Sequence, residues 1–204
     1  MRKKKELTSN QLIEAAFELF AQHGIEKTSL AMIATKVGIT KPSIYYHFAS
    51  KEELIDRIFE YSLGDYQFDH FVQIDECNEQ NFAKKLYQAG LRMFPEKDEI
   101  YLRVLNEFMS YAVRNEKYLK RIAKFEQEFI EGFQDLLQKG ADLGIVKPQN
   151  IAAKAHMLAI VIDGIQDSIV MQMPFKTDYK DIWREVVNSV LTKNQNEFGE
   201  DEQL

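Results

Sequence analysis

Apolar residues recur every three or four positions along most of the chain, a spacing typical of helices with one buried face. The predicted helices cover about 8–22, 28–36, 51–68, 80–94, 98–113, 116–142, 149–172 and 178–193, with a short additional helix that begins after Thr40. No segment shows the strict alternation of apolar and polar residues expected of a half-buried strand. The pattern therefore predicts an all-α protein of about nine helices.

Capping and turn-forming residues mark several of the predicted helix ends. Gly24 follows the first helix, where glycine is favoured because it accepts a left-handed backbone. Ser50 and Glu53 form an S-x-x-E pattern that caps the helix after them. Residues 69–79 lose the helical spacing and are predicted to form a connection.

Residues 28–51 have the internal spacing of a helix-turn-helix. Ala34 stands four residues before Gly38, and Ile44 follows six residues later. In this arrangement the small residue lets two helices approach, the glycine forms the turn and the apolar residue anchors the second helix. The second helix of such a unit normally lies in the DNA major groove. The spacing therefore predicts that this stretch binds DNA.

The charge of the chain is divided unevenly. The net charge of the 204 residues is −6, but residues 1–51 hold eight Lys and Arg against four acidic residues and so carry +4. The rest of the chain carries −10. A basic end on an acidic body is expected when only that end meets phosphate.

The exposed positions predicted around the second helix of this unit carry hydrogen-bond donors and no acid. They are Thr40, Lys41, Ser43, Tyr45, Tyr46 and His47. Lys41 and Ser43 are predicted to reach base edges, and the three aromatic residues that follow to contact the DNA backbone. Thr28 and Lys51 begin the flanking helices and are further predicted phosphate contacts. The alternative is a solvated polar helix.

The stretch IEKTSLAMIATKVGITKPSIYYHFASKEEL, residues 25–54, resembles the DNA-binding domain of the TetR family of bacterial transcriptional regulators. The glycine turn, the Y-x-H-F ending and the S-K-E-x-L helix start stand at the family's spacing. A weaker similarity extends through residues 116–170. The resemblance implies a homodimer with a helix-turn-helix domain at 1–50 and a helical ligand-binding and dimerisation domain at 51–204. It also implies that Thr28, Lys41, Ser43, Tyr45, Tyr46, His47 and Lys51 occupy DNA-contact positions.

Aromatic residues of the body helices are candidates for an apolar ligand pocket. The candidate pocket residues are Phe94, Phe108, Tyr111, Phe125, Phe129, Phe133, His156, Met157 and Asp163. His156 and Asp163 are the two polar residues, and they belong to a mostly apolar helix. The alternative is a filled core, because aromatic residues at helical spacing usually pack against one another. For His156 and Asp163 the alternatives are helix capping, a dimer contact or exposure.

The last two helices carry more apolar surface than one chain needs, and we expect part of it to form a dimer interface. The residues assigned to that interface are Ile165, Ile169, Trp183, Val186 and Val190. A two-fold dimer would place two recognition helices in successive major grooves, roughly 34–36 Å apart, on a near-palindromic site.

The resulting hypothesis is a homodimeric repressor that binds double-stranded operator DNA. A small, largely apolar inducer would release it by moving the helix at 51–68. One alternative is a ligand-independent or activating regulator of the same fold, and another is a helical enzyme or scaffold.

Several function classes lack support in the sequence. No glycine-rich phosphate loop, nucleophile elbow or H-E-x-x-H pattern indicates an enzyme. The four histidines are scattered, so neither a metal site nor a cofactor is expected. The single cysteine suits a reducing compartment, and no apolar run is long enough to cross a membrane. A cytoplasmic protein is therefore expected.

Overall fold

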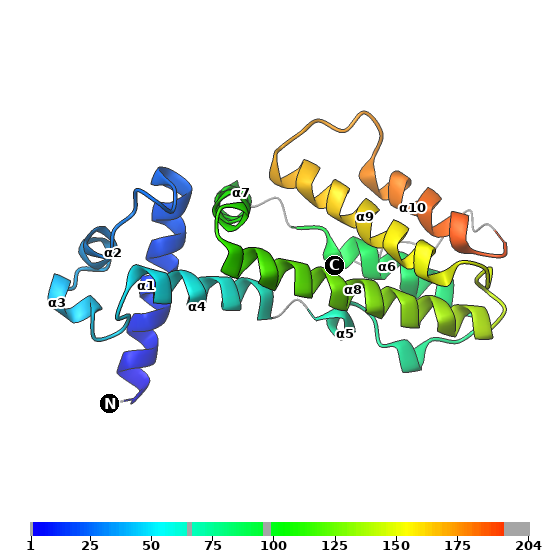
Figure 1. Ribbon diagram of the computed structural model, residues 1–204, viewed down its shortest axis with the longest axis horizontal. Coiled ribbons are helices and arrows are strands. Elements are labelled where there is room, and N and C mark those ends of the chain that lie inside the picture. The colour runs from blue at the N-terminus through cyan, green and yellow to red at the C-terminus, as the bar shows by residue number, and fades with distance from the viewer. Residues whose placement is uncertain (1, 65–66, 96–98, 194–204) are drawn as a thin grey trace. The chain divides into compact units, whose positions relative to one another are not determined.

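A computed structural model describes residues 2–64, 67–95 and 99–193, and the side chains of 9–60, 67–95 and 100–193. Within these residues the helices are α1 (Arg2–His23), α2 (Leu30–Val37), α3 (Lys41–Ile44), α4 (Lys51–Gly64), α5 (Phe68–Phe71), the 3-10 helix η1 (Ile74–Glu76), α6 (Phe82–Met93), α7 (Glu99–Val113), α8 (Glu116–Asp142), α9 (Ile151–Val170) and α10 (Tyr179–Val190) (Figure 1). An isolated antiparallel bridge joins Val146 and Leu191. The predicted all-α class is confirmed. None of the described helices is long and apolar enough to cross a bilayer.

The predicted helix positions agree with the structure except near residues 2–8 and 69–79. The first helix begins at Arg2 rather than near residue 8. The predicted connection at 69–79 is wrong in part, because α5 and η1 fall at this position. Helices of three or four residues are too short to show a period in the sequence.

The predicted capping box at the start of α4 is confirmed. The amide of Glu53 donates to Ser50 Oγ over 3.1 Å, and Glu53 Oε2 accepts from the amide of Ala49 over 2.7 Å. The first bond satisfies the amide of Glu53, which has no partner inside the helix, and the second ties the amide of Ala49, just before the cap, to the first turn. The position of this helix is therefore fixed by local chemistry.

The chain divides into two compact units. The first comprises Met1–Tyr66 and Lys97–Leu119, and the second comprises Gln67–Glu96 and Lys120–Leu204. The first unit therefore adds α4 and α7 to the predicted DNA-binding domain of 1–50. The helix α8 begins in the first unit and continues through the second.

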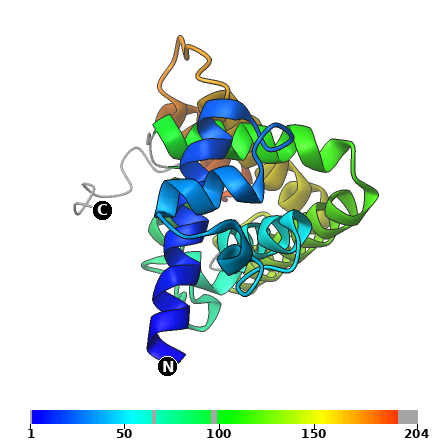
Figure 2. The ribbon, with the colours of Figure 1, turned by 90° about the vertical axis from the view of Figure 1, so that its left-hand side faces the viewer.

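In the first unit α1 packs against both α2 and α7, and α2 packs against α3. Two views show α2 and α3 together on one side of α1 (Figures 1 and 2). The core contains fully buried aliphatic residues from four helices, and the ring of Phe20 meets that of Phe108 edge-on, with centroids 6.3 Å apart. Burial of this surface, at about 25 cal/mol per Å² of apolar area, holds the short helices in place.

In the second unit α10 packs against α6 and α9. Trp183 of α10 is completely buried, and its indole Nε1 donates to the carbonyl of Tyr87 over 2.8 Å. A Cβ atom on Gly90 would lie 2.2 Å from this indole, so only glycine permits the two helices to approach this closely.

Candidate nucleic-acid interface

A glycine turn and two buried side chains hold α3 in place. Helix α2 ends at Gly38, whose φ of 77° lies in the left-handed region that glycine adopts without strain. The amide of Ile39 donates to the carbonyl of Ala34 over 2.9 Å and completes the helix end. On the other side of α3, Ile44 is 0% exposed and Phe48 is 3% exposed. The helix-turn-helix predicted from the sequence is therefore confirmed.

The positions between these anchors face solvent. Thr40, Lys41 and Ser43 are exposed, and Tyr45 and Tyr46 are exposed by 49% and 68%. Lys41 has no hydrogen-bond or ion-pair partner among the described residues. Thr40 occupies the predicted N-cap position, but its hydroxyl is hydrogen-bonded to Ser43 Oγ (2.7 Å) and not to the helix backbone. The turn thus presents hydroxyl, ammonium and phenol groups on one exposed surface.

His47 is held more firmly than its neighbours. It is half-buried, and a 3.1 Å hydrogen bond joins its Nδ1 to Ser9 Oγ of α1. The ring of Tyr46 stands edge-on to the imidazole, with centroids 5.6 Å apart. These contacts connect the turn after α3 to α1 and restrict the orientation of the imidazole.

The chain from residue 27 to residue 51 contains four lysines and no acid. Lys36 is paired with Glu18 of α1 over 2.7 Å. Lys27 and Lys41 are exposed and form no ion pair among the described residues. Lys27 was absent from the predicted contacts, although its place in this acid-free run could have indicated it. An exposed surface of this composition attracts phosphate, since nothing within the run offsets its charge.

Lys51, at the start of α4, has a structural contact of its own. Its Nζ donates to the carbonyl of Glu26 over 3.0 Å and thereby ties α4 to the segment after α1. Partial burial lowers the pKa of its ammonium group, and the nearby Glu26 carboxylate opposes that shift. The side chain is half-buried, and its ammonium group retains two further donors.

The environment of the Thr28 side chain differs from the predicted one. Its side chain is 1% exposed, and its hydroxyl lies within hydrogen-bond distance of the carbonyls of Gly24 (2.9 Å) and Leu19 (3.2 Å). Both carbonyls belong to the end of α1 and the residue after it, so the hydroxyl is directed into the protein. The side chain therefore does not present its hydroxyl at the surface, and a DNA contact by Thr28 stays a prediction.

Comparison with known proteins matches the helix-turn-helix region to a known family. The family model described as "Bacterial regulatory proteins, tetR family" matches residues 12–58, which include every position of the exposed surface described above. The uncharacterized HTH-type transcriptional regulator YfiR of Bacillus subtilis is 29% identical over 166 residues, 79% of each chain. Residues 12–58 are therefore a DNA-binding domain of the TetR-family type. The curated proteins that the chain resembles are named as HTH-type transcriptional regulators.

Solved structures of this family share the whole fold. A TetR transcription regulator from Haloarcula marismortui superposes with a TM-score of 0.73 at 18% identity, covering 90% of this chain and 97% of that one. SmeT of Stenotrophomonas maltophilia, in complex with triclosan, gives a TM-score of 0.68 at 19% identity, with 90% and 89% covered. At these identities the similarity shows the fold alone.

The aromatic residues predicted to line a pocket are divided between the two units. Phe108 and Tyr111 belong to the first unit, where Phe108 packs on Phe20 and Phe59 and Tyr111 packs on Tyr118. Phe94 belongs to the second unit and packs on Tyr179 and Trp183. Phe108 and Tyr111 are therefore joined through Phe59 and Tyr118 in one cluster of the first unit, and Phe94 lies in another cluster in the second.

Phe125, Phe129 and Phe133 do come together, on the face of α8 that meets α5. Phe129 stacks on Phe125 with centroids 4.7 Å apart, and Phe68 meets Phe129 and Phe133 edge-on. A Cβ atom on Gly132 would lie 2.3 Å from the ring of Phe68, so this part of the cluster is closely packed. The sequence missed Phe68 because it stood at the end of the helix predicted over 51–68, whereas in the structure α4 ends at Gly64 and Phe68 begins the separate helix α5.

The other three residues of the predicted pocket lie on α9. Met157 is half-buried, whereas His156 and Asp163 are exposed, and His156 Nδ1 is 2.9 Å from the carbonyl of Ala152 one turn earlier. Partial desolvation, with repulsion from Glu126 and Asp167, raises the pKa of the Asp163 carboxyl to about 6. Both polar residues therefore belong to the outer surface of α9 in the single chain.

The residues predicted to form the dimer interface are mostly internal. Ile165, Ile169, Trp183 and Val190 are 4%, 7%, 0% and 0% exposed within one chain, and only Val186 is half-buried. Four of the five are therefore already covered within one chain, and their assignment to an interface with a second chain stays a prediction. The exposed large apolar residue of α9 is Ile160, at 66%. Ile160 lies on the face of α9 opposite the buried one, and this position in the sequence could have indicated it as an interface residue.

Proposed function

We propose that this protein is a homodimeric repressor that binds a near-palindromic operator and is released by a small, largely apolar ligand. The observation that carries the proposal is the acid-free, donor-rich surface around α3. Lys41 and Ser43 are assigned to base edges, and Thr40, Tyr45, Tyr46, His47 and Lys51 to phosphates. Each of these side chains except the half-buried His47 and Lys51 is exposed on the helix-turn-helix.

A second copy of the chain is supported by an exposed face on α9. The exposed residues Ala153, His156, Ile160 and Gly164 follow one another at three- and four-residue steps along this helix. The opposite face of α9 is already buried within the chain. Small residues on either side of an exposed isoleucine permit the close approach of a partner helix. Pairing through this face would supply the second recognition helix that a near-palindromic site requires.

An inducer is supported by the aromatic cluster of the second unit and by a relative of the same fold. SmeT, which resembles this chain in fold, forms a complex with triclosan, a small molecule. The cluster of Phe68, Phe125, Phe129 and Phe133 offers aromatic contacts to an apolar ligand of this kind. Ligand binding can weaken DNA binding only if the ligand prefers the conformation that does not bind DNA.

We assign to α4 and α8 the transmission of the conformational change from the ligand site to the DNA-binding unit. Lys117 Nζ lies 2.6 Å from Asp56 of α4, and the Tyr118 hydroxyl donates to the same carboxylate over 2.9 Å. These contacts fix the start of α8 to α4 in the first unit, and α8 continues into the second. A displacement of α8 would therefore reach the helix that carries the DNA-binding unit.

The DNA-binding part is tested by fluorescence anisotropy with DNA from upstream of the gene that encodes the chain. Binding should weaken as salt concentration rises, because phosphate contacts release counterions. Lys41→Ala and Tyr46→Ala should each weaken binding about ten-fold, the size expected for the loss of about 1.4 kcal/mol from one contact. Sedimentation should show dimers for both variants.

Lys176→Ala provides the matched control. Lys176 is exposed on the segment between α9 and α10, so its loss should leave DNA affinity unchanged. Absence of binding at low salt would contradict the proposal. An effect of Lys176→Ala as large as that of Lys41→Ala would instead show that only overall charge matters.

A further inference from the structure

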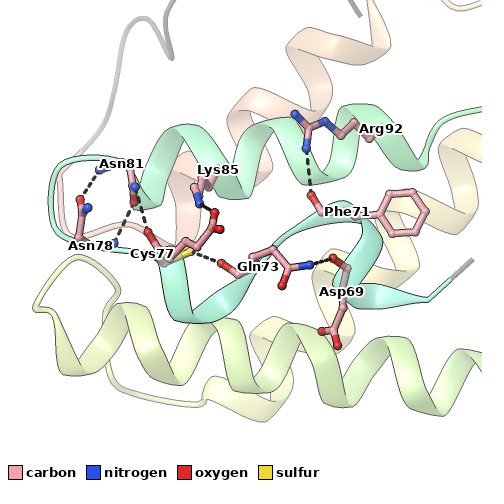
Figure 3. Close-up of polar contacts among 9 residues, drawn as sticks. Asp69, Phe71, Gln73, Cys77, Asn78, Asn81, Lys85 and Arg92 are labelled. Carbon is pink, nitrogen blue, oxygen red and sulfur yellow. Dashed lines mark hydrogen bonds and ion pairs between the residues drawn. The ribbon is translucent and has the colours of Figure 1, made fainter.

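A polar cavity lies beside α6 in the second unit. Its volume is about 560 Å³, and its polar lining residues are Asp69, His70, Gln73, Glu76, Lys85, Gln88 and Arg92. Phe71 also lines it and packs on Phe129 of the aromatic cluster. We call it the α5–α6 pocket, since one wall is the segment 69–76 and the other is α6 (Figure 3). Sites for small molecules have volumes of roughly 300–1,000 Å³.

The 69–76 wall is held in shape by hydrogen bonds within the protein. Gln73 Nε2 donates to the carbonyl of Asp69 over 2.5 Å, and Cys77 Sγ contacts the carbonyl of Gln73 at 3.6 Å (Figure 3). Asn81 Nδ2 donates to the carbonyl of Glu76 over 3.1 Å. The wall is therefore formed before any ligand arrives, which lowers the entropic cost of binding.

The α6 wall presents a row of polar side chains. Lys85, Gln88 and Arg92 lie three and four residues apart and so share one face of the helix. Lys85 is already neutralised, because its Nζ is 2.7 Å from Glu76 Oε2. Its charge is therefore unavailable to a ligand unless this pair breaks.

Arg92 is the cation of the pocket that has no carboxylate partner. Its guanidinium makes one long hydrogen bond, 3.5 Å, to the carbonyl of Phe71, and forms no ion pair among the described residues. A guanidinium has five N–H donors, so four of them are unused. Gln88, one turn earlier, likewise has no side-chain hydrogen bond within the described chain.

We propose that the α5–α6 pocket binds a small molecule bearing one carboxylate group, which Arg92 holds. The planar guanidinium matches a carboxylate through two parallel hydrogen bonds, and the amide of Gln88 can donate a third. Asp69 lines the same cavity, and its carboxylate has no partner within the described part of the chain, so it suits a ligand that also carries an ammonium or hydroxyl donor.

The charge of the pocket argues against a phosphate. Arg92 is the one lysine or arginine of the described lining without an ion pair, and the carboxylate of Asp69 lies in the same cavity, while Glu76 is neutralised by Lys85. A doubly charged group would therefore meet one attraction and one repulsion, whereas a single carboxylate with an ammonium group would be matched by Arg92 and Asp69.

The test is an NMR titration of the full-length protein, without DNA, that follows the Arg92 Nε–Hε signal. L-alanine, acetate and inorganic phosphate are the probes, with sodium chloride matched for ionic strength. L-alanine should shift the signal saturably and bind at least ten-fold more tightly than phosphate, with acetate between them. Because no DNA is present, the result does not depend on the proposed repressor function.

Two variants make the outcome specific. The Arg92 Nε–Hε signal is assigned by its loss in Arg92→Gln. The same variant should abolish the shifts that L-alanine causes at neighbouring amides of α6. Arg121→Gln, on α8 and outside the pocket lining, should leave them unchanged. No saturable shift from L-alanine or acetate, equal shifts in Arg92→Gln, or tighter binding of phosphate would each overturn the proposal. Circular dichroism checks that both variants are folded.

Discussion

Thr28 shows how a single residue can occupy a family's DNA-contact position and still serve the fold. In the sequence it opens a helix beside a DNA-binding turn, and a hydroxyl at a helix start is a common phosphate ligand. In the structure its hydroxyl instead bridges the carbonyls of Leu19 and Gly24. The hydroxyl therefore ties the segment before α2 to the end of α1.

Thr28→Val tests this role, because valine keeps the shape and removes the donor. The substitution should reduce the free energy of unfolding by about 1–2 kcal/mol, since a buried carbonyl loses its partner. Urea denaturation measures the change. Thr35→Val is the matched control: its hydroxyl donates to the carbonyl of Ala31 over 2.8 Å, but it is exposed and water replaces the bond. Unchanged stability with reduced DNA affinity would instead indicate direct contact.

At the scale of elements, the close approach of α6 and α10 determines which face of α10 is buried. Trp183 fits over Gly90, and its indole is fixed by the hydrogen bond to Tyr87. The apolar stripe of α10 predicts a buried face but does not identify the neighbour that buries it. The neighbour is α6 of the same chain, so Trp183 is already covered within one chain.

Gly90→Ala should destabilise the second unit by about 1–3 kcal/mol, because the added methyl group overlaps a buried ring that cannot turn away. The cost exceeds the gain of up to about 1 kcal/mol that alanine brings to a helix. Trp183 is the only tryptophan, so a red shift of its fluorescence should accompany the loss of stability. Gly164→Ala, whose Cβ would meet no atom within 4 Å, should leave the emission unchanged. Native emission from Gly90→Ala would contradict this packing.

At the scale of the whole molecule, the proposed dimer forms through the exposed face of α9, and operator binding depends on that dimer. Within one chain only the face of α9 containing Leu158, Ile162 and Ile165 is buried. Ile160, on the other face, is 66% exposed. The proposed dimer would pack on this face.

Ile160→Lys should convert the dimer to monomer and weaken operator binding at least ten-fold, although Ile160 lies outside the DNA-binding unit. Sedimentation velocity and anisotropy measure the two effects. Val113→Lys is matched in exposure, at 69%, and lies on α7, so it should change neither. A dimer that survives Ile160→Lys would show that another surface joins the two chains.

The sequence by itself determined the local structure of the protein. It predicted α8 to the residue, the capping box before α4, and the helix-turn-helix with its exposed donors. Each depends on contacts within a few residues, which spacing and residue type determine directly. The short helices α5 and η1 escaped prediction because each contains about one helical turn, too little to show a repeating pattern.

The tertiary structure decided which face of each helix meets which neighbour. It turned Thr28 inward, covered Trp183 with α6 and left Ile160 exposed, and it brought Arg92 opposite the 69–76 segment. Helical periodicity identifies the residues that share a face, but burial depends on contacts between segments distant in the chain. Those contacts are set by packing of the whole unit, and no local pattern encodes them.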